Sequence, residues 1–183
     1  MEDTFVTIIG VITASIIMFI GPLILISDRS DDVSQLLAQT ATAEFVNEVI
    51  KEGKITNDSY QRFISSLQSS GNTYDVDIEV KILDETTSKI VTDEDPTKIG
   101  NNTYYSIFTS QIEDKLGISS QNITYNRTGQ LILKQGDLIF VTTKNSSQTL
   151  SQVLKSFYSD STSGNLQIIA ASSSGTININ GLT

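Results

Sequence analysis

The sequence from Phe5 to Ile26 reads FVTIIGVITASIIMFIGPLILI and contains no charged residue. As an α-helix this stretch is roughly 33 Å long at 1.5 Å per residue, which matches the ~30 Å hydrocarbon core of a lipid bilayer. The chain after Ser27 is polar and carries the patterns of a domain folded in water. We therefore expect a transmembrane anchor at residues 1–30 and a soluble α+β domain at residues 31–183.

The N-terminal residues favour an uncleaved anchor over a secretory signal. A signal peptide has a basic start, a shorter apolar run and a cleavage site after small residues. Here residues 1–4 are acidic, the run is long, and Ser27-Asp28-Arg29 is a poor context for cleavage. Arg29 is the only basic residue close to the run, so charge specifies the orientation poorly. We expect a single-pass membrane protein with its domain on the outer face.

Within the anchor, a set of residues is expected to contact lipid or neighbouring helices. Gly10, Ala14 and Ser15 are small residues within two turns, and such residues allow close helix packing. Ordinary lipid-facing variation explains them equally well. Gly21 and Pro22 predict a kink, because proline removes a backbone donor and clashes with the preceding turn. The candidate membrane and assembly residues are Ile8, Gly10, Ile12, Ala14, Ile16, Ile20, Gly21 and Pro22.

The composition of the 183-residue chain argues against several classes of function. It has 21 acidic and 12 basic residues and a net charge of −9, so nucleic-acid binding through phosphate contacts is not expected. It has no cysteine and no histidine, which excludes thiolate metal sites and removes the usual general base. Nucleotide-binding, zinc-protease and hydrolase motifs are absent from the sequence. We expect no enzyme activity, no cofactor and no bound metal.

The soluble domain alternates helical and strand patterns. Apolar residues at helical spacing predict helices at 33–52, 57–69, 103–116 and around 150–157, the last capped by Ser146 or Ser147. Only residues 27–32 separate the apolar run from the first of these helices, so one long helix, half in lipid, is compatible with the sequence. Tyr74 to Ile82 alternates apolar and charged residues and is the clearest strand. Further strands are expected at 122–125, 131–134, 137–144, 166–171 and 176–180, with a turn at 172–175 making the last pair a hairpin.

These elements predict an α+β domain with helices packed on an antiparallel sheet. Asp75, Asp77 and Glu79 form an acidic ladder on the charged face of the clearest strand. A weak divalent-cation site is one interpretation and a solvated strand face is the other. Alternate strand positions are too far apart to surround one ion, so the solvated face is favoured. The acidic segment 84–100 lacks the calcium-loop spacing and is expected to be an exposed loop.

Two stretches carry a resemblance to a known family. Thr42-Ala-Glu-Phe-Val46 is followed by Gly53-Lys-Ile-Thr56, and Ser70-Gly-Asn-Thr-Tyr-Asp75 enters the alternating strand. Together with the apolar N-terminal helix, they resemble TadE-like, pilin-like single-pass membrane proteins of Gram-positive Tad-pilus or conjugation-type gene clusters. The resemblance covers roughly the first half of the chain.

The resemblance implies a structural subunit without catalytic residues, whose partners are the lipid bilayer and other subunits of a larger assembly. The chain departs from the pilin pattern in two ways. No Gly-then-Glu processing pattern precedes the apolar run, and Met1 directly precedes Glu2, which stands near the place where pilins carry an acid.

The leading hypothesis is therefore a non-enzymatic, membrane-anchored assembly protein that packs through its N-terminal helix. The alternative is a virion component of a large DNA virus, a minor capsid or inner-membrane protein that tethers membrane to shell. A sensor or binding module is a third class, and it would require a concave pocket with convergent polar groups.

Overall fold

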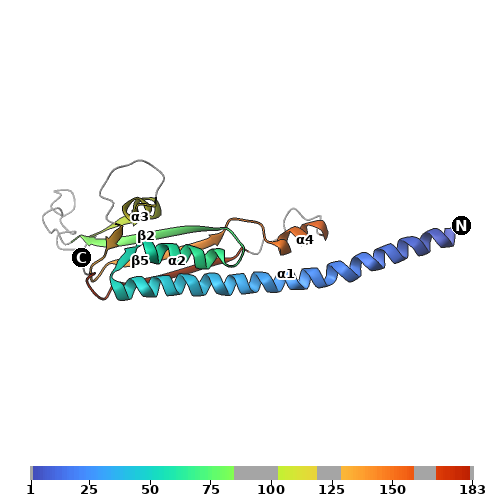
Figure 1. Cartoon of the computed structure of the whole chain (residues 1–183), viewed down its shortest axis with the longest axis horizontal. Coiled ribbons are helices and arrows are strands. Elements are labelled where there is room, and N and C mark those ends of the chain that lie inside the picture. Colours follow the sequence, from blue (N-terminus) through green and yellow to red (C-terminus); the bar gives the residue numbers. More distant parts are fainter. Residues whose placement is uncertain (1, 85–102, 119–128, 159–167, 182–183) are drawn as a thin grey trace.

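The computed structural model describes residues 2–84, 103–118, 129–158 and 168–181. A very long first helix, α1, projects far beyond the sheet and the remaining helices (Figure 1). The elements in chain order are α1 (Glu2–Glu52), β1 (Lys54–Thr56), α2 (Asn57–Gln68), β2 (Tyr74–Asp84), β3 (Thr103–Phe108), α3 (Thr109–Leu116), β4 (Gln130–Ile132), β5 (Leu138–Asn145), α4 (Leu150–Tyr158) and β6 (Ala170–Thr176).

The main sheet has four strands in the order β3-β2-β5-β6, and β1 and β4 form a separate pair. Every strand pair is antiparallel. In the main sheet Val80 lies opposite both Ile107 and Ile139, and all three side chains are buried. Alternation along the strands leaves Asp77 and Thr142 exposed on the other face. The molecule is therefore a two-layer α+β structure, with helices packed on one face of an antiparallel sheet.

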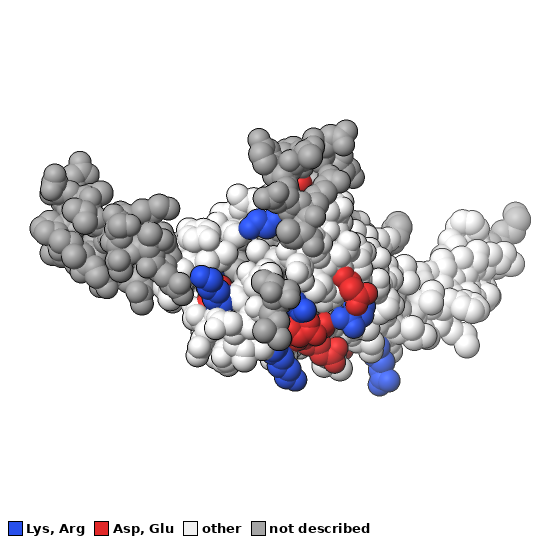
Figure 2. Space-filling model, turned by 60° about the vertical axis from the view of Figure 1, so that its left-hand side comes forward, with Lys and Arg blue, Asp and Glu red and all other residues white. Residues whose placement is uncertain are grey.

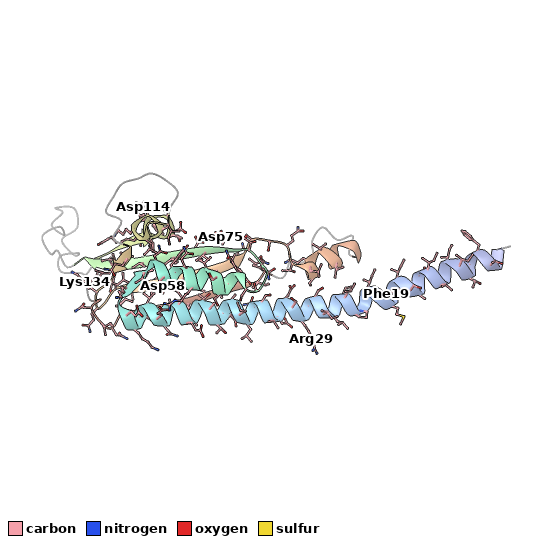
Figure 3. The ribbon with its side chains drawn as sticks, in the orientation of Figure 1. Phe19, Arg29, Asp58, Asp75, Asp114 and Lys134 are labelled. Carbon is pink, nitrogen blue, oxygen red and sulfur yellow. The ribbon has the colours of Figure 1, made fainter. Side chains whose placement is uncertain are left out.

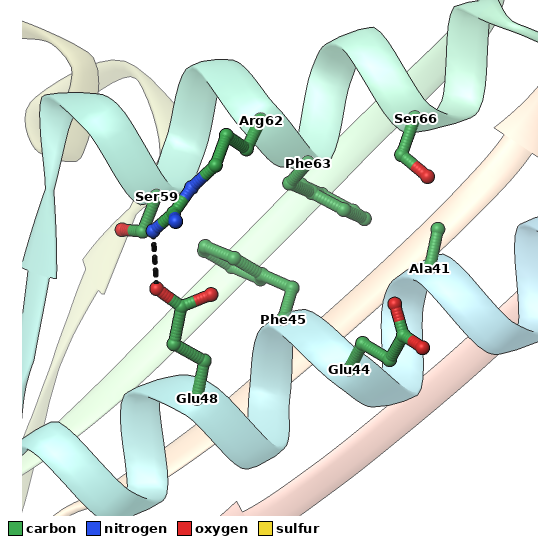
Figure 4. A pocket seen from close by; sticks show the side chains of 8 residues that line it. All are labelled: Ala41, Glu44, Phe45, Glu48, Ser59, Arg62, Phe63 and Ser66. Carbon is green, nitrogen blue, oxygen red and sulfur yellow. Dashed lines mark hydrogen bonds and ion pairs between the residues drawn. The ribbon is translucent and has the colours of Figure 1, made fainter.

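Among the helices, α1 contributes the most buried side chains to the core, all from its C-terminal half. Phe45 of α1 stacks on Phe63 of α2, with ring centroids 4.5 Å apart and an interplanar angle of 10° (Figure 4). The buried Thr42 hydroxyl lies 3.2 Å from the hydroxyl of Thr143 on β5. Gly175 of β6 lies so close to Ile50 that a Cβ at this position would collide with that side chain. Small residues on β6 thus allow α1 to approach the sheet closely.

α1 ends where the sequence predicts. Gly53 has a φ of +64° and its N–H donates to the carbonyl of Val49 at 2.8 Å. Helices often end in a left-handed residue of this kind, which glycine adopts without the steric cost of a Cβ. A Cβ at Gly53 would also lie 2.6 Å from the backbone N of Gly181. The turn after α1 is thereby held against the C-terminal part of the described chain.

Most predicted elements are confirmed, although some of their bounds shift. Helices at 33–52 and 57–69 and strands at 74–82 and 137–144 are present, and α1 continues unbroken from the apolar run through Pro22. The predicted helix at 103–116 is wrong in its first half, because residues 103–108 form β3. The predicted hairpin is also wrong, because residues 172–175 lie within β6. The strand predicted at 122–125 and most of the loop predicted at 84–100 lie outside the described residues.

Candidate membrane and assembly surface

The N-terminal half of α1 exposes its apolar side chains along its length. Ile12 is 54% exposed, Met18 76% and Phe19 72%. By length and composition this is the one described helix able to cross a membrane, and none of its most apolar window is buried within the protein. Figure 2 shows no charged side chain on the projecting part of α1 that this view exposes, and Figure 3 shows Phe19 standing away from the domain. The segment is therefore not a core helix of its own chain.

The eight residues predicted to form the anchor surface all lie on this projecting half. Seven of them are exposed, and a Cβ added to Gly10 or Gly21 would meet nothing within 4 Å. Ile20 is half-buried, as is Ile24 one turn later. Apart from Ile20, the structure therefore places the predicted residues on an exposed surface, away from the domain. The exposed members are Ile8, Gly10, Ile12, Ala14, Ile16, Gly21 and Pro22.

Directly after the apolar run, α1 carries a buried polar stripe. Ser27, Asp31 and Ser34 recur at helical spacing and are 3%, 4% and 3% exposed. The hydroxyl of Thr149 donates to Asp31 Oδ2 at 2.8 Å, and the hydroxyl of Ser151 donates to Asp28 Oδ1 at 2.5 Å. These contacts join α1 to the start of α4, so that the end of the apolar run is also a docking point for another helix.

Thr149 directly precedes α4 and caps its start. Its N–H donates to Gln152 Oε1 at 3.2 Å, and the N–H of Gln152 donates to Thr149 Oγ1 at 3.3 Å. This reciprocal arrangement satisfies the free donors at a helix start, and the Asp31 carboxylate lies at the end of α4 that favours negative charge. The sequence prediction of a cap at Ser146 or Ser147 is therefore wrong by two or three residues. Sequence reasoning also missed the contact between α1 and α4. The signal for it was the helical spacing of the polar residues 27, 31 and 34 on α1.

Two apolar side chains in the described part of α4 are exposed. Leu150 is 63% exposed and Val153 36%, whereas Thr149 and Ser151 are each 2% exposed. An amphipathic helix on a water-soluble domain normally buries its apolar side. Here α4 turns polar side chains toward α1 and leaves these two apolar side chains outside.

The exposed apolar surface of α1 continues beyond the acidic residues that follow the run. Val33 and Leu36 are 63% and 64% exposed, although they share the helical spacing of the apolar residues that predict the helix at 33–52. The face that packs on the domain instead contains Ala38, Phe45 and Val49. Gln35 is also engaged, because its side-chain amide bonds both the carbonyl and the N–H of Ala170 at the start of β6. Val33 and Leu36 thus lie on a side of α1 that the domain leaves open.

Other polar groups are taken up by structural contacts. Glu79 of the acidic ladder accepts a hydrogen bond from Ser106 at 2.7 Å and lies 3.8 Å from Lys81. Among the described residues, no group of three or more acidic side chains is placed to hold a metal ion. Tyr60 donates to Glu113 Oε1 at 2.6 Å, and burial together with this carboxylate raises the pKa of the tyrosine well above its usual value.

A shallow hollow separates α1 from α2. Phe45 and Phe63 form its floor, and Arg62 donates across it to Glu48 Oε1 at 2.6 Å (Figure 4). The ion pair is largely exposed, with 62% of the arginine side chain accessible, so it contributes about 0–1 kcal/mol. Of the charged residues that line the hollow, Arg62 and Glu48 pair with each other, and Glu44 is exposed on α1.

The comparisons with known proteins add no family to this geometry. Models of known protein families, curated protein sequences and solved structures were compared with the chain, and none matches it.

Proposed function

We propose that this is a non-enzymatic, membrane-anchored structural protein that joins a larger assembly by packing α1 against neighbouring subunits. The observation that supports the proposal is the length of the exposed apolar surface on α1. It begins in the uncharged run from Phe5 to Ile26 and extends to Val33 and Leu36.

Two environments are needed to cover this surface. A bilayer accounts for the uncharged run, since its helical length matches the hydrocarbon thickness. Val33 and Leu36 lie seven and ten residues beyond Ile26, which is roughly 10–15 Å farther along a helix. Asp28, Arg29 and Asp32 precede them, so hydrocarbon is not the expected surroundings there. A neighbouring protein surface covers these two side chains in the proposed assembly.

The anchor is tested by introducing a charge into the projecting half. A lysine at the centre of a membrane helix costs about 3 kcal/mol, so Ile12→Lys and Ile16→Lys are each expected to move the protein from the membrane fraction to the soluble fraction. Ile12→Leu is the matched control and should stay with membranes. Membrane retention of both lysine variants would overturn the anchor.

Assembly is tested separately at the second part of the surface. Leu36→Asp combined with Val33→Asp is expected to leave membrane association unchanged and to reduce chemical cross-linking between copies in the native membrane at least tenfold. Gln61→Asp, an exposed position on α2, adds charge away from α1 and should leave cross-linking intact. If the double variant assembles like the unmodified protein, α1 acts only as an anchor.

A further inference from the structure

The face of α4 that carries Leu150 and Val153 points away from the protein, and the structure indicates what covers it. The first turn of α4 is fixed against α1 by two hydrogen bonds, from Thr149 to Asp31 and from Ser151 to Asp28. Both acids follow Ile26 within five residues. The first turn of α4 therefore lies level with the end of the apolar run.

From this point α4 continues toward the N-terminal end of α1. Figure 1 shows α4 beyond the sheet, running beside α1 in the direction of its projecting half. Ile20 and Ile24 agree with this course, because they are half-buried while Leu23, Leu25 and Ile26 are exposed. Both lie on the face of α1 that presents Asp31 to the start of α4. The nine residues of α4 extend roughly 13 Å along α1 at 1.5 Å per residue.

We propose that α4 is a second membrane-contacting helix, which enters the lipid boundary beside α1 and presents Leu150 and Val153 to lipid. This inference rests on the anchor proposed above. If the run spans the hydrocarbon, the first turn of α4 lies at the headgroup level and the helix continues beside the run within the lipid boundary, because Lys155 in its sequence opposes deeper burial in hydrocarbon. A helix that faces water buries its apolar side, whereas one that enters lipid turns that side outward and keeps its polar side chains on protein partners. Thr149 and Ser151, bonded to the two acids, satisfy this second arrangement.

The sequence provides a convenient reporter, because the chain contains no tryptophan. Four single-tryptophan variants of the full chain are reconstituted in phosphatidylcholine vesicles, and quenching by brominated phosphatidylcholines is measured. Leu150→Trp and Val153→Trp probe α4, and Phe19→Trp probes the apolar run. Phe108→Trp, at a side chain 55% exposed on β3, is the control in water.

We expect lipid quenching in both α4 variants, with a graded depth. Because Val153 lies about one turn farther along α4 than Leu150, its variant should be quenched more strongly by lipids brominated deep in the chain. The Phe19→Trp variant should respond to the deepest bromines, and the Phe108→Trp variant should be quenched at least fivefold less than either α4 variant.

Other outcomes overturn the inference in recognisable ways. If the α4 variants behave like Phe108→Trp, the outward face of α4 lies in water. If their emission is shifted to the blue without lipid quenching, and the shift disappears on dilution with excess lipid, a second copy covers the face. If Phe19→Trp is also unquenched, the anchor itself fails and the inference falls with it. Lipid quenching of Phe19→Trp alone retains the anchor and rejects the role of α4.

Discussion

The projecting half of α1, residues 4–26, and its packed half, residues 27–52, are parts of one helix with opposite surroundings. The packed half contains alanine, glutamate, glutamine and leucine, which favour a helix in water. The projecting half is rich in isoleucine, valine and threonine, which are poorer helix formers in water. In the proposed membrane anchor, hydrocarbon compensates, because an unpaired backbone group there costs several kcal/mol. On this proposal the same backbone geometry depends on tertiary packing in one half and on lipid in the other.

The largest expected difference between the halves comes from placing one lysine in each. Val49 is fully buried, so Val49→Lys places an unpaired charge in the core and is expected to lower the free energy of unfolding by about 4 kcal/mol or more. Ile12→Lys in the projecting half should change it by less than about 0.5 kcal/mol, since exposed substitutions seldom do more. Urea unfolding of the full chain in detergent measures both. Equal losses would mean that the projecting half belongs to the folded core.

The main features of this helix were predictable from the sequence. An uncharged run, a periodic segment and a glycine at position 53 predict a long apolar N-terminal helix, a domain helix and the end of α1. The membrane role of the run stays a prediction. The side of α1 that remains free was not predictable, because Val33 and Leu36 share the spacing of core residues. Their exposure depends on where α1 crosses the sheet, and local periodicity carries no information about that.

The two wrong elements have physical causes of the same kind. Tyr104, Ile107 and Ile112 fit a helical stripe, yet Ile107 pairs with Val80 in the sheet and residues 103–108 are extended. Aromatic and β-branched residues in this segment were the available signal. Residues 172–175 have turn composition, yet they lie within β6, where each pairs with a residue of β5. Tertiary packing decided both cases.

The junction between the halves allows a second, smaller test. Asp31→Ala removes the acceptor of the buried Thr149 hydroxyl, and leaving such a group unsatisfied costs about 1–3 kcal/mol. We expect the free energy of unfolding to fall by about 2 kcal/mol and amide exchange in α4 to accelerate, while membrane association persists. Asp31→Asn, which keeps an acceptor oxygen, should lose less than half as much. A loss of membrane association in Asp31→Ala would show that docking and anchoring are not separable.

The smallest expected effect concerns the hydroxyl pair that joins the packed half to β5. Thr42 Oγ1 donates to the carbonyl of Ala38 at 2.7 Å and lies 3.2 Å from Thr143 Oγ1. Thr42→Val and Thr143→Val should each cost about 1 kcal/mol, because each leaves one buried hydroxyl with fewer partners. Replacing both by valine leaves no hydroxyl with a missing partner, so the double variant should lose about 0.5–1 kcal/mol less than the sum of the single losses.

A hydroxyl in the projecting half provides the control for this cycle. Ser15 Oγ donates only within its own helix, to the carbonyl of Val11 at 2.8 Å, so Ser15→Ala should leave the unfolding of the domain unchanged. Additive losses for Thr42→Val and Thr143→Val would contradict a direct interaction between the hydroxyls. The position of α1 on the sheet would then rest on apolar contacts such as Phe45 with Phe63. A coupled loss instead identifies a polar contact that distinguishes the packed half from the projecting half, whose serine bonds only to its own helix.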